Sequence, residues 1–279
     1  MKVTDLTLTN FNNRAFNVHT YTLDSIGDLV TAKHPLAIVI PGGSFDHLSL
    51  REGEPVALAF NNCGFNSVVM EYNLVQDEGD IYPDAGLDVL STVKYFRDHA
   101  AEYEIDPERI VTVGFSAGGH VASLANSMAN SPEYQKEFNF TSKAVLPNKT
   151  ILGYPLINLA KIGFDIPEDE LDKVPADDFV KNSALGVTDK TPATFIFHAW
   201  DDPIVLVNNT LEYLEALREH NVPCEAHLFN RGGHGFSLAR TDMVVKGREW
   251  QDNPHAGHWF ELAKEWLKRL CNQVNESDA

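Results

Sequence analysis

A serine lies between two glycines in the segment Gly114-Phe115-Ser116-Ala117-Gly118, where a short apolar run ends and an alanine-rich helical pattern begins. A strand that turns into a helix through Gly-x-Ser-x-Gly holds the serine hydroxyl at the end of a sheet, beside the positive N-terminus of the helix. The turn is so sharp that a Cβ at either glycine would collide with a neighbouring element. The segment therefore predicts Ser116 as a nucleophile, provided that the rest of the chain supplies its partners.

A serine hydroxyl is nearly inert at pH 7 and needs an imidazole base whose tautomer is fixed by a carboxylate. Asp202 follows the apolar run at 194–198, and His234 lies between glycines after the run at 224–229. Serine, acid and histidine, each past the end of a different strand, form a known catalytic order. Asp202 is preferred over Asp201 because it begins the loop into the next helix, and Asp201 then becomes a solvated neighbour or a helix cap.

Eleven histidines compete for the role of base. His234 is preferred because its flanking glycines let the backbone turn the imidazole towards the end of the sheet. His120 lies one helical turn after Ser116, and His198 ends a buried run, so both are interpreted as structural. His47 is kept as a candidate substrate contact, with a plain loop residue as the alternative.

A second glycine loop, Pro41-Gly42-Gly43-Ser44-Phe45, follows the apolar run at 36–40. Backbone N–H groups in such a loop can face a ligand and stabilise a developing oxyanion, although an ordinary Pro-Gly-Gly turn is the alternative. Four side chains expected near the same sheet end are candidates for a small acyl pocket, with packing between loops as the alternative for each: Phe45, His47, Trp200 and Phe236.

The elements that must position these groups alternate along the chain. Alternating polarity predicts antiparallel strands at 2–9 and 16–23, and continuous apolar runs predict buried strands. Those runs lie at 36–40, 67–72, 110–113, 150–154 and 194–198, and a last strand is predicted at 224–229. Helices are predicted at 55–62, at 84–101, directly after Ser116, at 207–220 and at 255–271. The pattern predicts an α/β fold, a three-layer α/β/α sandwich around a mostly parallel eight-stranded sheet.

The chain of 279 residues is long enough for one domain with a large core. The acidic, proline-punctuated segment 157–190 is interpreted as a small cap or loop insertion over the sheet end, and a solvated excursion fits its composition equally well. Forty acidic and 22 basic residues give a formal charge of −18, which argues against nucleic acid or an anionic membrane as a partner.

Cysteine usage and the N-terminus predict a cytoplasmic protein. Cys63, Cys224 and Cys271 are far apart, odd in number and without metal-ligand spacing, which fits a reducing compartment. The first residues contain no apolar segment typical of a signal peptide, and no run approaches the ~20 apolar residues of a membrane span.

Several segments together resemble α/β-hydrolases of the carboxylesterase and carbohydrate acetylesterase group, close to small bacterial enzymes of the feruloyl/acetyl-xylan esterase type. They extend from residue 36 to about 240 and read PGGSF, EYNL, YPDAGLDVLSTVKYFR, GFSAGGHVAS, ILGYPLINL, FIFHAWDDPIVLVNN and GGHGFSLA. The resemblance implies Ser116 as nucleophile, Asp202 as acid and His234 as base. It also implies oxyanion donors from the N–H of Ala117 and of Gly43 or Ser44.

One departure concerns the oxyanion loop. Hormone-sensitive-lipase relatives begin it with His-Gly-Gly-Gly, whereas this chain has Pro41-Gly42-Gly43-Ser44. Proline occurs in the acetylesterase branch, but serine in place of the third glycine is less usual. Ser44 keeps its N–H and adds a hydroxyl, which puts the oxyanion geometry, rather than catalysis, in question.

The expected function is hydrolysis of short acyl esters, acetyl esters above all, with acetylated sugars as the suggested small-molecule substrates and no metal or organic cofactor. The sequence leaves open whether the protein forms a homo-oligomer, since relatives of this group often associate. A serine peptidase of the prolyl-oligopeptidase type is the second hypothesis, because HAWDD and GGHGF also resemble that group, but its propeller domain is missing. A non-catalytic binding protein of the same fold is the third, and the complete set of three residues argues against it.

Overall fold

The computed structural model describes residues 1–24, 33–164 and 177–276, with side chains up to residue 268. Eight strands form one sheet in the order β1-β2-β4-β3-β5-β6-β7-β8. Strands β1 and β2 pair antiparallel, as do β2 and β4, and all other pairs are parallel. The strands are β1 (Lys2–Thr9), β2 (Ala15–Thr22), β3 (His34–Ile40), β4 (Asn66–Glu71), β5 (Ile105–Phe115), β6 (Lys149–Gly153), β7 (Ala193–Ala199) and β8 (Cys224–Phe229).

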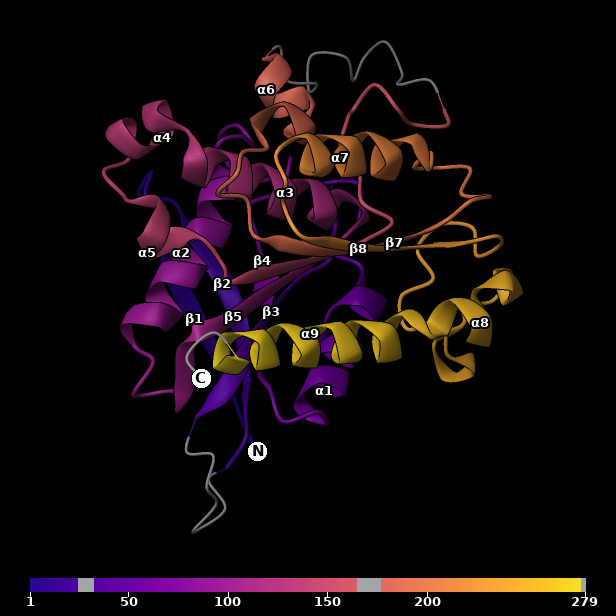
Figure 1. The fold of residues 1–279 in the computed structure, drawn as a ribbon, viewed down its shortest axis with the longest axis horizontal. Helices are drawn as coiled ribbons and strands as arrows, with labels where there is room; N and C mark the ends of the chain where they lie inside the picture. The colour runs from indigo at the N-terminus through magenta and orange to yellow at the C-terminus, as the bar shows by residue number, and fades with distance from the viewer. Residues whose placement is uncertain (25–32, 165–176, 277–279) are drawn as a thin grey trace.

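Helices cover both faces of the sheet and bury its two apolar surfaces (Figure 1). One face packs against α2 (Asp84–Asp98), α3 (Ser116–Asn130) and α7 (Asn208–Glu219), and the other against α1 (Glu54–Asn61) and α9 (Trp259–Glu276). The short helices are α4 (Pro132–Glu137), α5 (Ser142–Val145), α6 (Asp178–Lys181) and α8 (Pro254–Gly257). The predicted three-layer architecture is confirmed.

Strand β5 begins five residues earlier than the apolar run at 110–113 predicts. Ile105 pairs with His34 on β3, and regular pairing resumes only between Leu36 and Ile110. Pro35 and Pro107 lie in the skipped stretch, and proline has no N–H to give to the ladder. The two prolines account for the irregularity that separates the early pairing from the buried part of the strand.

The segment expected as a cap falls partly outside the described residues, which omit 165–176. Its first described end is fastened to α7 by Asn209. The Oδ1 of Asn209 accepts hydrogen bonds from the N–H of Ile157 and Asn158 at 3.0 and 2.9 Å, and its Nδ2 donates to the carbonyl of Lys161 at 2.7 Å. No helix in the described ranges is long and apolar enough to cross a membrane.

A buried polar network joins the β1–β2 turn to α2 and to the loop after β4. Asn10 Nδ2 donates to Asp84 and to Asp88, each at 2.8 Å. Asp88 Oδ2 accepts from the backbone N–H and the Nδ2 of Asn73, also at 2.8 Å. Burial raises the pKa of Asp88 to about 7, although the hydrogen bonds from Asn73 and Asn10 oppose that rise. The folded chain therefore holds this proton at a pH where an unfolded chain releases it.

This raised pKa predicts a stability component that decreases with rising pH. Between the ordinary value of 3.8 and about 7, only the unfolded chain loses the proton, which costs up to ~1.4 kcal/mol per pH unit. Asp88→Asn has no proton to lose. The free energy of unfolding of the wild-type protein minus that of the variant should fall by roughly 1–3 kcal/mol from pH 5 to pH 8 in urea titrations. A difference that is constant or increases with pH would contradict the assignment.

Candidate active site

The turn between β5 and α3 has the strained backbone that its glycines predict. Ser116 has φ 50°, in the left-handed region that is costly for a residue with a side chain. A Cβ on Gly114 would lie 2.6 Å from the carbonyl oxygen of Gly118, and a Cβ on Gly118 would lie 2.1 Å from that of Ile40. Neither position can hold a larger residue without a shift of the backbone.

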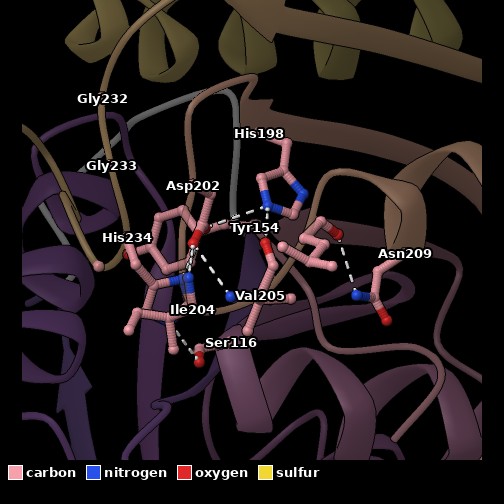
Figure 2. Close-up of polar contacts among 12 residues, drawn as sticks. Ser116, Tyr154, His198, Asp202, Ile204, Val205, Asn209, Gly232, Gly233 and His234 are labelled. Atoms are coloured by element: carbon pink, nitrogen blue, oxygen red, sulfur yellow. Dashed lines mark hydrogen bonds and ion pairs between the residues drawn. The ribbon is translucent and has the colours of Figure 1, made fainter. Parts of the chain in front are cut away.

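The structure brings Ser116, His234 and Asp202 together in a continuous chain of hydrogen bonds (Figure 2). Ser116 Oγ lies 2.8 Å from His234 Nε2, and His234 Nδ1 lies 2.7 Å from Asp202 Oδ2. Ser116 and Asp202 are 9% and 4% exposed, so the chain leads from a nearly dry carboxylate to a hydroxyl at the edge of solvent. This geometry can transfer a proton from serine to histidine.

Asp202 has a full set of donors in a buried position. Its Oδ1 accepts from the N–H of Ile204 and Val205 at 2.9 and 3.0 Å, and its Oδ2 also lies 3.1 Å from His198 Nε2. Burial alone would raise the pKa of Asp202, but the hydrogen bonds with His198 and His234 outweigh it and the pKa is lowered. The carboxylate is therefore ionised at neutral pH, as an orienting acid must be.

Asp201 is solvent-exposed, as expected of a solvated neighbour, and does not cap a helix, but its carboxylate also has a structural contact. Its Oδ1 accepts from the N–H of Gly232 and of Gly233 at 2.9 and 3.0 Å. These glycines precede His234, so Asp201 fastens the loop that carries the imidazole. Asp202 contacts the imidazole itself (Figure 2). The sequence shows two adjacent aspartates after the end of a strand, but it does not indicate that Asp201 holds the loop and Asp202 the imidazole.

The glycine loop after β3 exposes backbone donors through three consecutive residues of positive φ. Gly43, Ser44 and Phe45 have φ of 131°, 56° and 64°. Glycine is required at 43, because a Cβ there would lie 2.0 Å from the carbonyl oxygen of His47. Among the described residues, the N–H groups of Gly43, Ser44 and Ala117 have no hydrogen-bond partner. All three remain available to a ligand.

Two adjacent side chains that sequence reasoning missed connect the loops of the site. Arg51 and Glu52 form the short 3-10 turn η1 (Leu50–Glu52) before α1. Glu52, 3% exposed, accepts from the N–H of Gly42 at 2.9 Å and from the hydroxyl of Tyr154 at 2.7 Å. The guanidinium of Arg51 donates to the carbonyl of Gly235 at 2.7 Å. No pattern in the sequence distinguishes this pair from surface charges.

The ring of Tyr154 packs against the imidazole of His234. Tyr154 follows β6, and its ring lies 5.2 Å from that of His234. Its hydroxyl donates to Glu52 and accepts from the N–H of Ser237 at 2.9 Å, so the ring is held at its far end. Tyr154 is the last residue of the strand predicted at 150–154, but nothing in the sequence indicated its role.

The prediction of Phe236 as a pocket wall is wrong. Gly235 has φ 69° and turns the chain back after His234, which sends Phe236 into the core with no exposed surface. Its ring packs 4.8 Å from Tyr154 and 5.7 Å from Phe197. It therefore supports the floor beneath the imidazole and cannot touch a substrate.

The other pocket candidates lie at the surface or half-buried. Trp200 is 60% exposed. Phe45 packs edge-on against Tyr82 and His120, with ring centroids 6.1 and 5.8 Å apart. His120 is fully buried and hydrogen-bonded to Tyr82 at 2.6 Å, and burial lowers its pKa to about 4. It is therefore an uncharged structural histidine behind Phe45, as the sequence predicts.

His47 lies in a groove of about 830 Å³ beside the oxyanion loop. The backbone N–H of Val75 donates to the carbonyl of Phe45 at 3.0 Å and joins the loop after β4 to the oxyanion loop. Polar residues outnumber apolar ones along the groove, and carboxylates outnumber cations. It is lined by Arg14, Ala15, Phe16, Asn17, Asp46, His47, Leu48, Glu71, Tyr72, Asn73, Leu74, Gln76, Asp77 and Glu78. Within the described residues no cluster of acidic, histidine or cysteine side chains could hold a metal ion.

Comparison with known proteins places the chain in a family. The BD-FAE family profile matches residues 28–217. The chain belongs to the BD-FAE family. A carboxylesterase structure from Lactobacillus plantarum superposes with a TM-score of 0.90 at 31% identity, covering 97% of this chain and 98% of that one. The BD-FAE chain thus has the predicted fold of an α/β-hydrolase of the carboxylesterase group.

Two relatives are larger proteins. An acetylxylan esterase of Xylanibacter ruminicola is 31% identical over 86% of this BD-FAE chain and 45% of its own length. An endo-1,4-beta-xylanase B of Butyrivibrio fibrisolvens is 32% identical over 76% of this chain and 34% of its own length. The chain therefore spans between a third and a half of these relatives. An acetyl ester-xyloside bifunctional hydrolase from Caldicellulosiruptor lactoaceticus superposes with a TM-score of 0.72 at 29% identity, over 92% and 89% of the two chains.

Glu52→Gln tests the connection between the loops. An amide has one acceptor oxygen, so either the N–H of Gly42 or the hydroxyl of Tyr154 loses its partner in a buried place. We expect a loss of about 1–3 kcal/mol in the free energy of unfolding, measured in urea. The exposed Glu133, changed to Gln, is the control and should alter stability by less than ~0.5 kcal/mol. Equal effects of the two substitutions would show that Glu52 has no special role.

Proposed function

We propose that this protein is a serine esterase that hydrolyses short acyl esters, acetyl esters above all, through a covalent acyl-enzyme. The observation that carries the proposal is the hydrogen-bonded chain from Ser116 through His234 to Asp202, which begins on a strained turn beside unpaired N–H groups. Such an arrangement activates a serine at neutral pH without a cofactor. The carboxylesterase structures of similar fold support the same class of reaction.

The reaction follows from the geometry. His234 Nε2 takes the proton of Ser116 as Oγ attacks the ester carbonyl, and Asp202 stabilises the imidazolium at Nδ1. The N–H of Ala117, with that of Gly43 or Ser44, donates to the oxyanion, and each donor lowers the barrier by ~3–4 kcal/mol. The alcohol leaves with the proton from His234. His234 then deprotonates a water molecule, which attacks the acyl-enzyme and releases the acid.

Acetylated carbohydrates are the proposed substrates. One similar protein is named an acetylxylan esterase and another an acetyl ester-xyloside bifunctional hydrolase. The polar groove beside the oxyanion loop suits a hydroxyl-rich alcohol half, because its side chains offer many acceptors and a few donors. Its lining follows the ends of β3 and β4 and includes the start of β2, one to three strand spacings from β5, so the groove extends on the order of 5–15 Å to the side of Ser116. A short oligosaccharide spans that distance.

Loss of the nucleophile tests the proposed chemistry. Ser116→Ala should lower kcat for p-nitrophenyl acetate by at least about a thousandfold, because no other group can form the acyl-enzyme. Ser131→Ala, which removes a hydroxyl without a hydrogen bond at the end of α3, is the matched control and should keep full activity. The wild-type enzyme should prefer acetate over butyrate and octanoate esters. Equal rates for wild type and Ser116→Ala would refute the esterase, and a preference for octanoate would indicate a lipase-like enzyme.

A groove substitution tests the alcohol half. His47→Ala removes an exposed hydrogen-bonding side chain from the groove. It should reduce kcat/KM for an acetylated xylo-oligosaccharide by roughly fivefold, the equivalent of about 1 kcal/mol, through a higher KM. The loss for p-nitrophenyl acetate should be smaller, since this ester has no sugar. His220→Ala, an exposed histidine after α7, is the control. Equal losses on both esters would remove the groove from substrate binding.

A further inference from the structure

A second histidine contacts the carboxylate of the site. His198 is the penultimate residue of β7 and has no exposed surface. Its Nε2 lies 3.1 Å from Asp202 Oδ2 and 2.9 Å from the carbonyl oxygen of Val205 (Figure 2). Its Nδ1 lies 2.8 Å from Thr210 Oγ1 on α7. It does not contact Ser116, so the reaction itself has no place for it.

These partners fix the tautomer of His198. An ionised carboxylate and a carbonyl oxygen only accept hydrogen bonds, so Nε2 must carry the hydrogen that both share. In the uncharged ring Nδ1 then accepts from the hydroxyl of Thr210. Asp202 Oδ2 consequently receives two N–H donors, one from His198 and one from His234, and the ring cannot rotate without losing three hydrogen bonds.

We propose that His198 is a positioning residue that sets how strongly Asp202 holds the imidazolium of His234. The inference rests on the proposed esterase function. With the N–H groups of Ile204 and Val205 on Oδ1, the donor from His198 completes a cage of four hydrogen bonds that aims Oδ2 at His234. The same donor draws negative charge from Oδ2. It therefore weakens the attraction between Asp202 and a protonated His234.

Other titratable groups around this cage are held by separate contacts. Asp201 is bound to the N–H groups of the loop that precedes His234. Tyr154 packs its ring on His234 and gives its hydroxyl to Glu52. From α7 the side chain facing His198 is the neutral Thr210. A substitution at 198 therefore acts on His234 through Asp202.

Two substitutions of matched polarity separate this role from packing. The amide nitrogen of Gln occupies roughly the place of the histidine Nε2, so His198→Gln keeps a donor towards Asp202. The shorter His198→Asn reaches only towards Thr210 and leaves Oδ2 with His234 alone. Thr210→Val is the control, because it removes a buried hydrogen bond of the same histidine and leaves the donor to Asp202 in place.

The experiment is the pH dependence of kcat/KM for p-nitrophenyl acetate from pH 5 to pH 9, with urea unfolding of each variant to establish that it is folded. In His198→Asn the inflection of the acidic limb should move up by roughly half to one pH unit, because the full charge of Asp202 then favours a protonated His234. In His198→Gln and Thr210→Val it should stay within about 0.3 pH unit of the wild type.

The same shift should appear in the NMR titration of the His234 imidazole, which requires a folded protein but no activity. If the wild-type protein shows no esterase activity, the proposed esterase function is overturned. The NMR titration would still decide the role of His198 in that case. Lower plateaus with unmoved inflections in both His198 variants would reduce the histidine to a packing residue. A downward movement in His198→Asn would reverse the proposed sign and overturn the inference.

Discussion

The site depends on a close approach of backbones that only glycine allows. The start of α3 passes so near the end of β3 that a Cβ on Gly118 would overlap the carbonyl oxygens of Ile40 and Pro41. A Cβ on Gly42 would lie 2.8 Å from that of Ser116. Because the start of α3 and the glycine loop after β3 are in backbone contact, Ser116 and the free N–H groups of that loop lie side by side at the end of the sheet. Every other part of the site is arranged around this contact.

Much of this arrangement could be predicted from the sequence, because strand ends meet at one edge of a parallel sheet. Ser116, Asp202 and His234 each follow a predicted strand, and the structure joins them. Side-chain direction within loops could not be predicted in the same way. Phe236 was misplaced since one positive φ at Gly235 reverses the chain. Glu52 and Arg51 escaped notice because charged residues in a polar loop usually face water, and their partners come from distant parts of the chain.

Two buried carboxylates show how neighbours decide what an acid can do. Asp88 accepts its hydrogen bonds from neutral amides, and burial raises its pKa to about 7, with the nearby Asp84 acting in the same direction. Asp202 is also buried, but its hydrogen bonds with two imidazoles lower its pKa. Amides can donate hydrogen bonds but cannot take up a proton to balance the charge, whereas an imidazole can. Only the second environment keeps a carboxylate ionised beside the imidazole that the proposed mechanism protonates in each turnover.

The η1 turn also ties the site to the order in which the chain is made. Arg51 reaches a carbonyl 184 residues later, and Glu52 reaches a hydroxyl 102 residues later. During synthesis the N-terminal residues leave the ribosome first, so the glycine loop and the serine turn exist long before the loop of His234 is available to them. A nascent chain therefore carries an unactivated serine. The contact between Ser116 and His234 can form only after the loop that follows β8 has been made.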